Sequence, residues 1–412
     1  MSDTLNDRFH AAMMGTFATP LAFLDRGEGA YVWDVDGKKY LDFLGGIAVN
    51  SLGHAHPVFV RAVREQAARL AHVSNYFATR PQLELAERLC SISGAGEQGR
   101  VIFGNSGAEA IEAAFKLARL GGAGSRSRIL TLKGSFHGRT MGALSLTGQP
   151  ALQESFTPLV PGVEHIEPTV AALEEAMYDS VAAVLFEPIQ GEAGVVDLPA
   201  GFIERARELT TQHGALLILD EIQTGIGRTG TWFAFEQFGV VPDAIAVAKG
   251  LAGGFPIGAL VTFGAASALL QRGHHGSTFG GNPLATAVAG AVLTELESAG
   301  LVDSAARQGH AIRELVSSLG SSQVAEVRGR GLLIGIGLVE PRAKELSAAA
   351  LELGLIINAP NDHSIRIAPP LIIGDAEVAE FGRLFSQALS TLDTAARDTA
   401  ARDTAALTTE AH

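Results

Sequence analysis

The stretch DAIAVAKGLAGG, residues 243–254, places a run of apolar residues directly before one lysine. The apolar part, Ala244 to Ala248, shows no alternation with polar residues, which is typical of a strand buried on both faces of a sheet. Lys249 ends the run, and glycines follow it. A buried ammonium is costly unless it is paired or loses its proton. The stretch therefore predicts a buried strand with a lysine of special function at its carboxyl end.

Five other runs resemble this strand in length and composition. They lie at 100–104, 128–132, 181–188, 215–220 and 258–263. Helical segments separate several of them, for example Phe202 to His213, which Gly214 ends. Buried strands that alternate with helices predict an α/β domain with a mostly parallel sheet.

The segments outside this domain have other patterns. The stretch YVWDVDGKKYLDF, residues 31–43, predicts a hairpin with a type I′ turn at Asp36-Gly37. After a long helical stretch, a small separate sheet is predicted from the strand-like runs at 330–338, 355–359 and 364–373. The last 20 residues repeat DTAAR, and we expect a solvated tail, a frayed helix or disorder there.

Composition argues against several classes of protein. The 412 residues carry a formal charge of −13, which disfavours a nucleic-acid partner, and 47% of them are apolar, which allows a large core. No apolar run approaches the roughly 20 residues needed to cross a bilayer, and the first residues lack the pattern of a secretory signal. The single cysteine, Cys90, excludes an intrachain disulfide, and no carboxylate cluster accompanies His54 and His56. We expect a soluble cytoplasmic protein with no metal, nucleic-acid or membrane partner.

Polar residues and glycines follow five of the predicted strands. Four of the loops read NSGAEA (105–110), KGSFHGRT (133–140), IQGEAG (189–194) and DEIQTG (220–225), and Lys249 follows the fifth strand. In open α/β sheets, ligands bind beyond the carboxyl ends of the strands. The five loops therefore predict one shared site.

Three features of these loops suit a single cofactor. The loop Gly104 to Gly107 enters a helix, so its N–H groups and the Ser106 hydroxyl could bind an anion. Asp220 needs a cation opposite it, such as a protonated ring nitrogen, and a desolvated Lys249 would react with a carbonyl. Pyridoxal phosphate, with its phosphate, pyridine ring and aldehyde, would use all three. Considered alone, the loop could be an ordinary capped helix, and Asp220 a helix cap or metal ligand.

Two side chains and one glycine motif add to this hypothesis. Phe136 could stack on the cofactor ring and Arg139 could bind a substrate carboxylate, although a core aromatic and a surface ion pair are the alternatives. GAGEQG, residues 94–99, has the G-x-G-x-x-G spacing of dinucleotide-binding proteins. It precedes its strand rather than following one, so it predicts a turn and disfavours a nicotinamide dehydrogenase.

From about Thr19 to Leu392 the chain resembles the class III, or acetylornithine/ornithine-type, aminotransferases. The resemblance rests on LGGIAVNSLGHAHP (44–57), NSGAEA, FHGRTMGALSLTGQP (136–150), EPIQGEAGV (187–195), LLILDEIQTGIGRTG (216–230), AKGLAGGFPIGA (248–259), HGSTFGGNPLA (275–285) and IRIAPPL (365–371). It implies the α/β, aspartate-aminotransferase-like fold of type I pyridoxal-phosphate enzymes. The large cofactor domain would span 58–290, the small domain 1–57 with 291–392, and the tail 393–412.

The resemblance also implies a role for each matching residue. Lys249 and Asp220 would be catalytic: Lys249 would bind the cofactor and move the reacting proton, and Asp220 would hold the pyridinium. The cofactor would contact Ser106, Gly107, Ala108, Phe136, Asp220, Glu221, Ile222, Gln223, Lys249 and Thr278. Gln223 would reach its ring hydroxyl, and Thr278 would reach the phosphate in the neighbouring subunit of a homodimer with shared sites. Substrate would meet Arg139, Ser277, and Arg366, which the family pairs with Glu192 when the other substrate is bound.

The implied reaction moves the side-chain amine of N2-acetyl-L-ornithine to 2-oxoglutarate in arginine biosynthesis. N-acetyl-L-glutamate 5-semialdehyde and L-glutamate would be the products. Ornithine, succinyl-diaminopimelate or 4-aminobutyrate could be the donor instead, and a catalytically silent binding protein of the same fold is the alternative from another class. The chain departs from the family pattern at Ile111, where asparagine is common, and at Ala193, where glycine or serine is usual.

Overall fold

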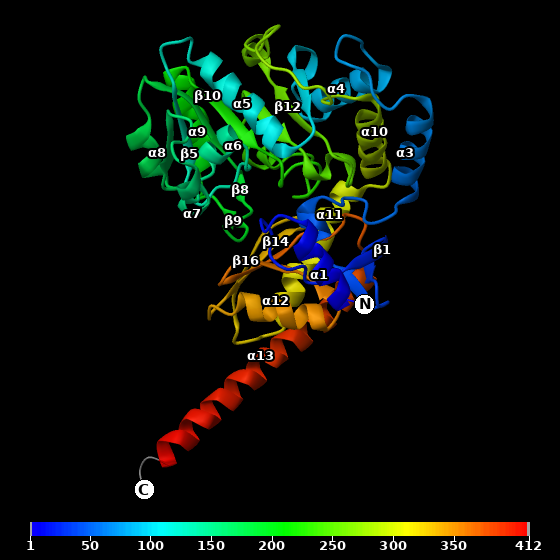
Figure 1. Cartoon of the computed structure of the whole chain (residues 1–412). Coiled ribbons are helices and arrows are strands. Elements are labelled where there is room, and N and C mark those ends of the chain that lie inside the picture. The colour runs from blue at the N-terminus through cyan, green and yellow to red at the C-terminus, as the bar shows by residue number, and fades with distance from the viewer. Residues whose placement is uncertain (1, 410–412) are drawn as a thin grey trace.

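A computed structural model describes the backbone of residues 2–409 and the side chains of residues 4–392. Its largest sheet, in the upper part of Figure 1, has seven strands. Their order is β4-β12-β11-β10-β7-β5-β6. Their bounds are β4 (Arg100–Gly104), β5 (Arg128–Leu132), β6 (Val163–Ile166), β7 (Val181–Phe186), β10 (Leu216–Asp220), β11 (Ala244–Val247) and β12 (Gly258–Thr262). All neighbours are parallel except the two pairs made by β12. The prediction of an α/β, mostly parallel sheet is confirmed, and β6 is an additional strand.

Alternate residues of the central strands face two different layers of helices. On one face, Ile218 of β10 belongs to the apolar cluster formed with α5 (Gly107–Gly121). On the other face, Leu217 and Leu219 pack in the cluster that includes α9 (Phe202–His213) and α10 (Pro283–Ser298). Because both faces are covered, the strands need apolar residues at every position, which explains their lack of alternation.

Shorter helices complete this large unit. They are α3 (Pro57–Arg69), α4 (Arg80–Ile92), α6 (Met141–Leu146), α7 (Pro150–Gln153), α8 (Val170–Ala176) and the 3₁₀ turns η1 (Gly96–Gln98), η2 (Glu154–Phe156), η3 (Ala234–Phe238), η4 (Lys249–Ala252) and η5 (Gly264–Ala268). The glycine motif at 94–99 forms η1 and the turn before β4, as predicted. Helix α10 packs on α3 and α4. Residue 290, where the sequence places a domain boundary, lies within this helix.

The remaining strands form three small sheets rather than the one separate sheet predicted. One sheet has the order β1 (Leu24–Glu28), β2 (Tyr31–Asp34), β3 (Lys39–Asp42), β15 (Leu355–Ile356). Another has the order β13 (Val324–Arg330), β14 (Leu333–Leu338), β17 (Ser364–Ile367), β16 (Asn358–Asn361), and β8 (Ile189–Gln190) pairs with β9 (Val196–Asp197). Because β15 pairs with β3, segments from both ends of the chain share one sheet.

The hairpin β2–β3 is present, but its predicted turn type is wrong. Trp33 pairs with Lys39, so the loop is longer than two residues, and only Gly37 in it has a positive φ, of 86°. The Asp34 carboxylate accepts hydrogen bonds from the N–H groups of Asp36, at 3.0 Å, and Lys38, at 2.8 Å. The side chain of Asp34 therefore closes this loop, which a type I′ turn would not require.

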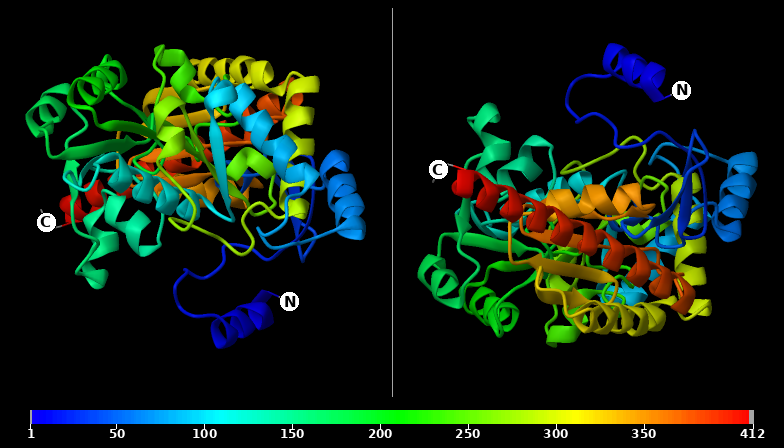
Figure 2. Two further views of the ribbon diagram at one scale, coloured as in Figure 1. Left: turned by 90° about the horizontal axis from the view of Figure 1, so that it is seen from above. Right: turned by 90° about the horizontal axis from the view of Figure 1, so that it is seen from below.

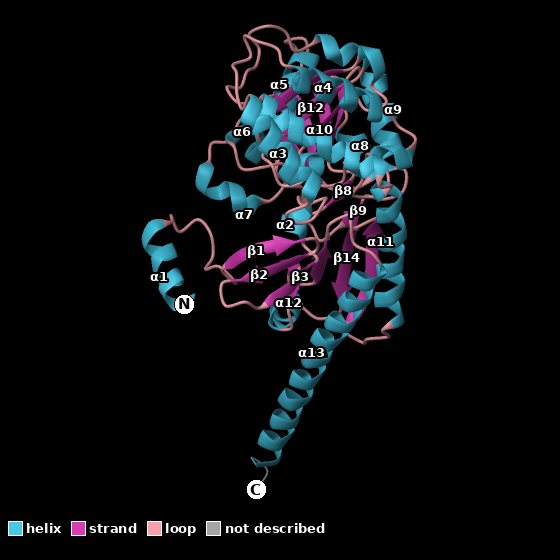
Figure 3. Cartoon of the chain, turned by 90° about the vertical axis from the view of Figure 1, so that its right-hand side faces the viewer, coloured by secondary structure: helices cyan, strands magenta, loops and turns pink. Residues whose placement is uncertain are grey.

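The last elements lie at the two ends of the chain. Helices α11 (Leu301–Ser318) and α12 (Ala343–Glu352) pack beside the small sheets, and α13 (Asp375–Thr409) runs through the DTAAR repeats and extends away from the body (Figures 1 and 3). Helix α1 (Ser2–Ala12) stands apart from the body on a connecting loop (Figure 2). The short α2 (Gly45–Ala48) has positive φ at all four residues and leads into the site.

Among the described residues, no single helix is long and apolar enough to cross a bilayer. Helices α10 and α11 reach the required length and composition only as a pair, and they are bent by 64° at their junction.

Candidate active site

The register of three parallel strands brings distant side chains to one edge of the large sheet. Asp220, the last residue of β10, pairs with Ala246 of β11, and Lys249 follows three residues later. On the other side of β10, Leu219 pairs with Phe186 of β7, and Glu187 follows directly. Asp220, Lys249 and Glu187 therefore meet beyond the carboxyl ends of their strands, where ligands of such sheets bind.

A cavity of about 500 Å³ lies at this edge. Its volume falls in the ordinary range for small-molecule sites. Ten of the fourteen predicted site residues line it: Ser106, Gly107, Ala108, Phe136, Arg139, Glu192, Asp220, Ile222, Gln223 and Lys249. The structure thus gathers side chains from five loops around one space, as the strand-end pattern predicts.

Lys249 has an unusual backbone and an unusual electrostatic environment. Its φ is 37°, a value that a residue with a side chain adopts only at a cost of about 1 kcal/mol or more. Burial lowers the pKa of its ammonium to about 8, although Glu192 acts in the opposite direction. The side chain lines the cavity, and no hydrogen bond or ion pair joins its amine to another described residue. A lysine of this kind is partly neutral near pH 8 and can act as a nucleophile or base.

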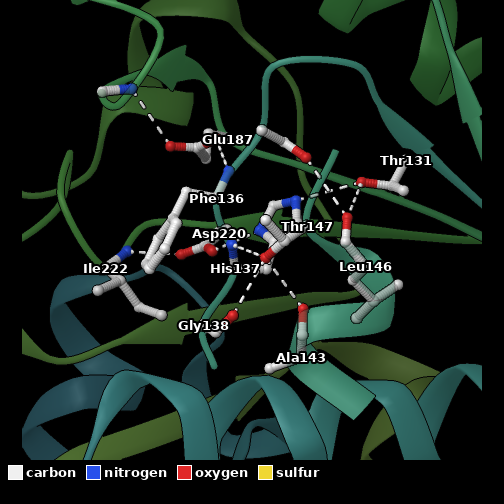
Figure 4. Close-up of polar contacts among 12 residues, drawn as sticks. Thr131, Phe136, His137, Gly138, Ala143, Leu146, Thr147, Glu187, Asp220 and Ile222 are labelled. Carbon is white, nitrogen blue, oxygen red and sulfur yellow. Dashed lines mark hydrogen bonds and ion pairs between the residues drawn. The ribbon is translucent and has the colours of Figure 1, made fainter. Parts of the chain in front are cut away.

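Asp220 lines the cavity and is held by a chain of hydrogen bonds (Figure 4). His137 Nδ1 donates to Asp220 Oδ2 at 2.7 Å, and the N–H of Ile222 donates to Asp220 Oδ1 at 3.0 Å. Nε2 of the same imidazole lies 3.2 Å from the Thr131 hydroxyl, and the backbone N–H of His137 donates to Thr147. These contacts fix the direction of the carboxylate and leave its remaining lone pairs for a cation in the cavity.

Glu187 joins the loop that carries Phe136 to the loop after β7. Its carboxylate accepts hydrogen bonds from the N–H of Phe136, at 3.0 Å, and of Gly191, at 3.2 Å (Figure 4). The pKa of Glu187 is raised from 4.5 to about 7, mainly by burial; the charge of Asp220 acts in the same direction, whereas His137 acts to lower it. Glu187 thus fixes the backbone beneath the Phe136 ring, over which Arg139 lies with its guanidinium carbon 5.7 Å from the centroid.

Replacing Glu187 with glutamine should change how stability depends on pH. Between pH 4.5 and 7 the unfolded carboxyl loses its proton while the folded one keeps it, so this group makes the protein less stable as the pH rises. The difference between these two pKa values corresponds to about 3 kcal/mol in the free energy of unfolding. Urea unfolding of the cofactor-free protein at pH 5 and pH 8 should show the variant gaining stability relative to the parent by about this amount at the higher pH. A difference between the two proteins that stays constant with pH would contradict the assignment.

The loop before α5 has the features that suit an anion. Ser106 caps the helix by accepting the N–H of Glu109 at 3.2 Å, which leaves its hydroxyl hydrogen available. A side chain at Gly258 on β12 would collide with the backbone oxygen of Ser106, so glycine is needed for the close approach of that strand. The N-terminus of the 15-residue α5 therefore faces the cavity with its partial positive charge.

Arg366, on β17 in the small sheet, does not line the cavity itself but contacts Glu192 and Gln223, which do. It is fully buried and forms an ion pair with Glu192 through NH1. Oε1 of Gln223 also accepts from NH1, at 3.3 Å, and Asn358 Oδ1 accepts from Nε at 3.1 Å. Burial acts to raise the pKa of Glu192, but the charge of Arg366 outweighs it and holds the pKa below its usual range. The pair thus sets one buried positive charge next to one carboxylate that could be exchanged.

Besides Arg366, three predicted residues lie outside the cavity. The carboxylate of Glu221 is buried on the far side of its loop, where it accepts hydrogen bonds from the Thr224 hydroxyl and the Phe235 N–H. Burial raises its pKa to about 7. Ser277 accepts from Asn105, a lining residue, at 3.2 Å, and Thr278 is exposed on the surface. Within one chain, neither Ser277 nor Thr278 meets the cavity.

Sequence reasoning missed several residues that surround the site. His137 and Glu187 stand in motifs quoted above; Glu187 directly follows the buried strand β7, and His137 lies in the loop after β5, and these positions were the available signal. Asn358 lies far along the chain in another sheet, and no local pattern indicates it. Ile111, which departs from the family pattern, is fully buried in the cluster between α5 and the sheet, so its side chain packs in the core.

The groups around the cavity fit pyridoxal phosphate. A helix N-terminus suits the phosphate, the fixed carboxylate of Asp220 suits a protonated ring nitrogen, and Lys249 suits the aldehyde. All three lie around one cavity, and each of them is costly to maintain without a ligand. This combination is the donor set that the sequence predicts for that cofactor.

Comparison with known proteins gives the same answer for the family. The family described as Aminotransferase class-III matches residues 14–389. The acetylornithine aminotransferase of Streptomyces coelicolor is 51% identical over 92% of this chain and 94% of its own length, and that of Mycolicibacterium smegmatis is 50% identical over 95% and 99%.

Solved structures agree with these sequence relatives. The ornithine aminotransferase of Toxoplasma gondii superposes with a TM-score of 0.90 at 33% identity and covers 96% of each chain. The N-acetylornithine aminotransferase of Stenotrophomonas maltophilia has a TM-score of 0.82 at 38% identity and covers 94% of this chain and 99% of its own. From its sequence, its fold and its relatives, the chain belongs to the class III aminotransferases, which are pyridoxal-phosphate-dependent transaminases.

Proposed function

We propose that this chain transfers the side-chain amino group of N2-acetyl-L-ornithine to 2-oxoglutarate. The observation that carries the choice of donor is the name acetylornithine aminotransferase on relatives that are 50–51% identical over more than nine tenths of the chain. The reaction would yield N-acetyl-L-glutamate 5-semialdehyde and L-glutamate and would serve arginine biosynthesis in the cytoplasm. The buried Arg366–Glu192 pair supports it, because the reaction must accept two substrates of different charge in turn.

In this proposal the loops of the large sheet hold the cofactor. Of the residues that line the cavity, Ser106, Gly107 and Ala108 would bind its phosphate, Phe136 and Ile222 would pack against its ring, and Gln223 would bind its hydroxyl. When bound, pyridoxal phosphate supplies the electron sink that makes the C–H bond beside the amine acidic. Asp220, oriented by His137, keeps a positive charge on the ring nitrogen.

Lys249 carries out the proton transfer in this scheme. Its Nζ would remove the proton from the donor carbon that bears the amine, and in the second half-reaction it would deliver a proton to the carbon of 2-oxoglutarate that receives the amine. The lowered pKa near 8 serves this task, because a base works best when its pKa lies close to the working pH. The apolar walls formed by Val49, Phe255 and Ile257 limit the access of water to the amine.

Two arginines would recognise the substrates. Arg139, exposed at the rim, binds the carboxylate of N2-acetyl-L-ornithine while Glu192 neutralises Arg366. When 2-oxoglutarate enters, Glu192 leaves Arg366 and a substrate carboxylate takes its place in the fork of the guanidinium. One buried cation can thus serve both half-reactions.

The visible absorption band of the cofactor-loaded protein tests this function. N2-acetyl-L-ornithine should bleach the band, and 2-oxoglutarate should restore it. Ornithine, succinyl-diaminopimelate and 4-aminobutyrate, added at equal concentration, should bleach it more slowly. A band that ignores N2-acetyl-L-ornithine but responds to one of these amines would overturn the proposed donor and keep the family.

Arg366→Ala should slow the half-reaction with 2-oxoglutarate by about 10²- to 10⁴-fold, because truncating a buried charged partner costs about 3–5 kcal/mol. The half-reaction with N2-acetyl-L-ornithine should lose much less. Arg366→Lys keeps the charge without the fork and should fall between the two proteins. Stopped-flow measurement of each half-reaction provides the comparison, and a selective loss in the N2-acetyl-L-ornithine half-reaction would reverse the roles of the two arginines.

We also propose that the chain works as a homodimer with shared sites. Large apolar side chains are exposed on the N-terminal segment, namely Met13, Met14, Phe17 and Leu21, and near Thr278, namely Tyr76, Phe77 and Phe279. Exposed apolar groups of this extent are typical of surfaces that another chain covers. A partner at this surface could bring its Thr278 to the phosphate. Sedimentation equilibrium should give twice the 42.9 kDa mass of the chain, and the monomer mass would contradict the proposal.

A further inference from the structure

Arg366 lies directly opposite Asn358 on the neighbouring edge strand. In the antiparallel pair β16–β17 the two residues are register partners, so their side chains lie on the same face of the sheet. The hydrogen bond from Arg366 Nε to Asn358 Oδ1, at 3.1 Å, follows from this register. On the other side the register partner is Gly335 of β14, which has no side chain. A Cβ at Gly335 would collide with the backbone oxygen of Gly194. Asn358 is therefore the one cross-strand side chain that holds the guanidinium from within its sheet.

A second asparagine on the same strand holds the other member of the ion pair. Asn361 Nδ2 donates to the backbone oxygen of Ala193 at 2.9 Å, and Ala193 directly follows Glu192. The Oδ1 of Asn361 accepts the N–H of His363 at 3.0 Å and closes the turn into β17. The register of β16 shifts between Asn358 and Asn361, which lets one short strand make both contacts.

We propose that Asn358 and Asn361 are positioning residues for the two substrates. Asn358 keeps the Arg366 side chain aimed at the cavity while Glu192 is displaced by a dicarboxylate. Asn361 anchors the loop of Glu192 so that its carboxylate returns to Arg366 when the amine donor binds. Each asparagine thus supports a different half-reaction. This inference rests on the exchange of partners at Arg366 under the proposed function.

The physical basis is the cost of ordering a long side chain. When Glu192 leaves, NH1 of Arg366 keeps only the 3.3 Å contact to Gln223, and Nε keeps the contact to Asn358. A guanidinium that is already oriented loses less entropy when it binds a carboxylate. Hydrogen bonds to charged groups are stronger than neutral ones. Loss of the Asn358 contact should therefore weaken the binding of a dicarboxylate about tenfold.

Two substitutions separate the two roles. Asn358→Leu keeps the approximate volume and removes the acceptor, so KM for 2-oxoglutarate should rise about tenfold with little change in the N2-acetyl-L-ornithine half-reaction. Asn361→Asp keeps the acceptor for the His363 N–H but turns a carboxylate oxygen toward the Ala193 oxygen. It should slow the N2-acetyl-L-ornithine half-reaction about tenfold with little change in KM for 2-oxoglutarate. A merely structural role would not produce this crossed pattern.

Binding without turnover provides an independent readout. Glutarate, a dicarboxylate without a keto group, is titrated calorimetrically into the cofactor-loaded protein. We expect about tenfold weaker binding to Asn358→Leu and unchanged binding to Asn361→Asp. Asp362→Asn is the matched control, because Asp362 lies in the same turn and its exposed side chain forms a surface ion pair with Lys344 at 2.8 Å. It should behave as the parent in every measurement.

The outcomes that overturn the inference differ from those that overturn the function. Glutarate binding by Asn358→Leu at the parental dissociation constant, or equal slowing of both half-reactions in both variants, would show that the asparagines do not position this pair. A parent protein whose bleached band is not restored by 2-oxoglutarate would instead overturn the proposed acceptor, whatever the variants do.

Discussion

Lys249→Ala should lose steady-state turnover by about four orders of magnitude. Proton transfer by a positioned base accounts for up to about 10⁴-fold of a rate, and the amine of Lys249 is the group of lowered pKa at the end of β11. The variant should also fail to bind the cofactor covalently. Reduction with borohydride followed by mass spectrometry should add the cofactor mass to the peptide with Lys249 in the parent and to no peptide in the variant.

Two further proteins separate the chemistry of Lys249 from its charge. Lys249→Arg keeps a positive charge, but arginine does not deprotonate in proteins, so it should be as inactive as the alanine variant. Lys133→Ala is a matched control, because Lys133 also follows a strand of the large sheet but forms an exposed ion pair with Glu167 at 2.6 Å. It should keep the parental activity. Substantial steady-state activity in Lys249→Ala would sink the assignment of Lys249 as the base.

The strands of the large sheet can be predicted because burial on both faces leaves a continuous apolar signal. All six residues of β7 are buried, and the sequence there reads VAAVLF. The missed strand, β6, contains Glu164 and His165 and lies at the edge of the sheet with one neighbour. An edge strand tolerates polar residues, so its pattern does not differ from that of a loop.

The small sheets are harder to predict because their pairing is long-range. Strand β15 has only two residues, and its partner β3 lies more than 300 residues earlier in the chain. Short apolar runs show that a strand exists but not which strand it joins. The hairpin β2–β3 is predicted correctly, but its turn type is not. The Asp-Gly pair alone suggests a two-residue turn, whereas the carboxylate of Asp34 closes a longer loop.

In the site, too, features set by local sequence can be predicted and those set by long-range contacts cannot. Asp220 and Lys249 can be placed together from the sequence because both end buried parallel strands, and such ends share one edge. The direction in which the Glu221 side chain points cannot be predicted from the sequence. It depends on whether the carboxylate accepts the Phe235 N–H or points into the cavity. The contact between Asn358 and Arg366 depends on a shifted register in a small sheet, which no local pattern encodes.

Asp220→Asn should reduce turnover by about 10²- to 10⁴-fold. Removing one member of a buried charge pair costs about 3–5 kcal/mol, and each 1.36 kcal/mol is tenfold in rate. Asparagine can still accept from the Ile222 N–H, but its amide has no negative charge to hold a protonated ring nitrogen. The cofactor should therefore still bind to the variant through Lys249 while the proton-transfer step slows.

The chain offers a second histidine–aspartate pair as a control for this variant. His213 Nδ1 lies 3.0 Å from Asp179 Oδ1, as His137 Nδ1 lies 2.7 Å from Asp220 Oδ2, but the Asp179 side chain is 99% exposed. Asp179→Asn should leave turnover and the cofactor spectrum unchanged, because an exposed pair contributes little. A primary isotope effect with donor deuterated at the reacting carbon should grow in Asp220→Asn, since proton removal becomes the slow step. Parental turnover in Asp220→Asn would mean that the cavity stabilises the ring by some group other than this carboxylate.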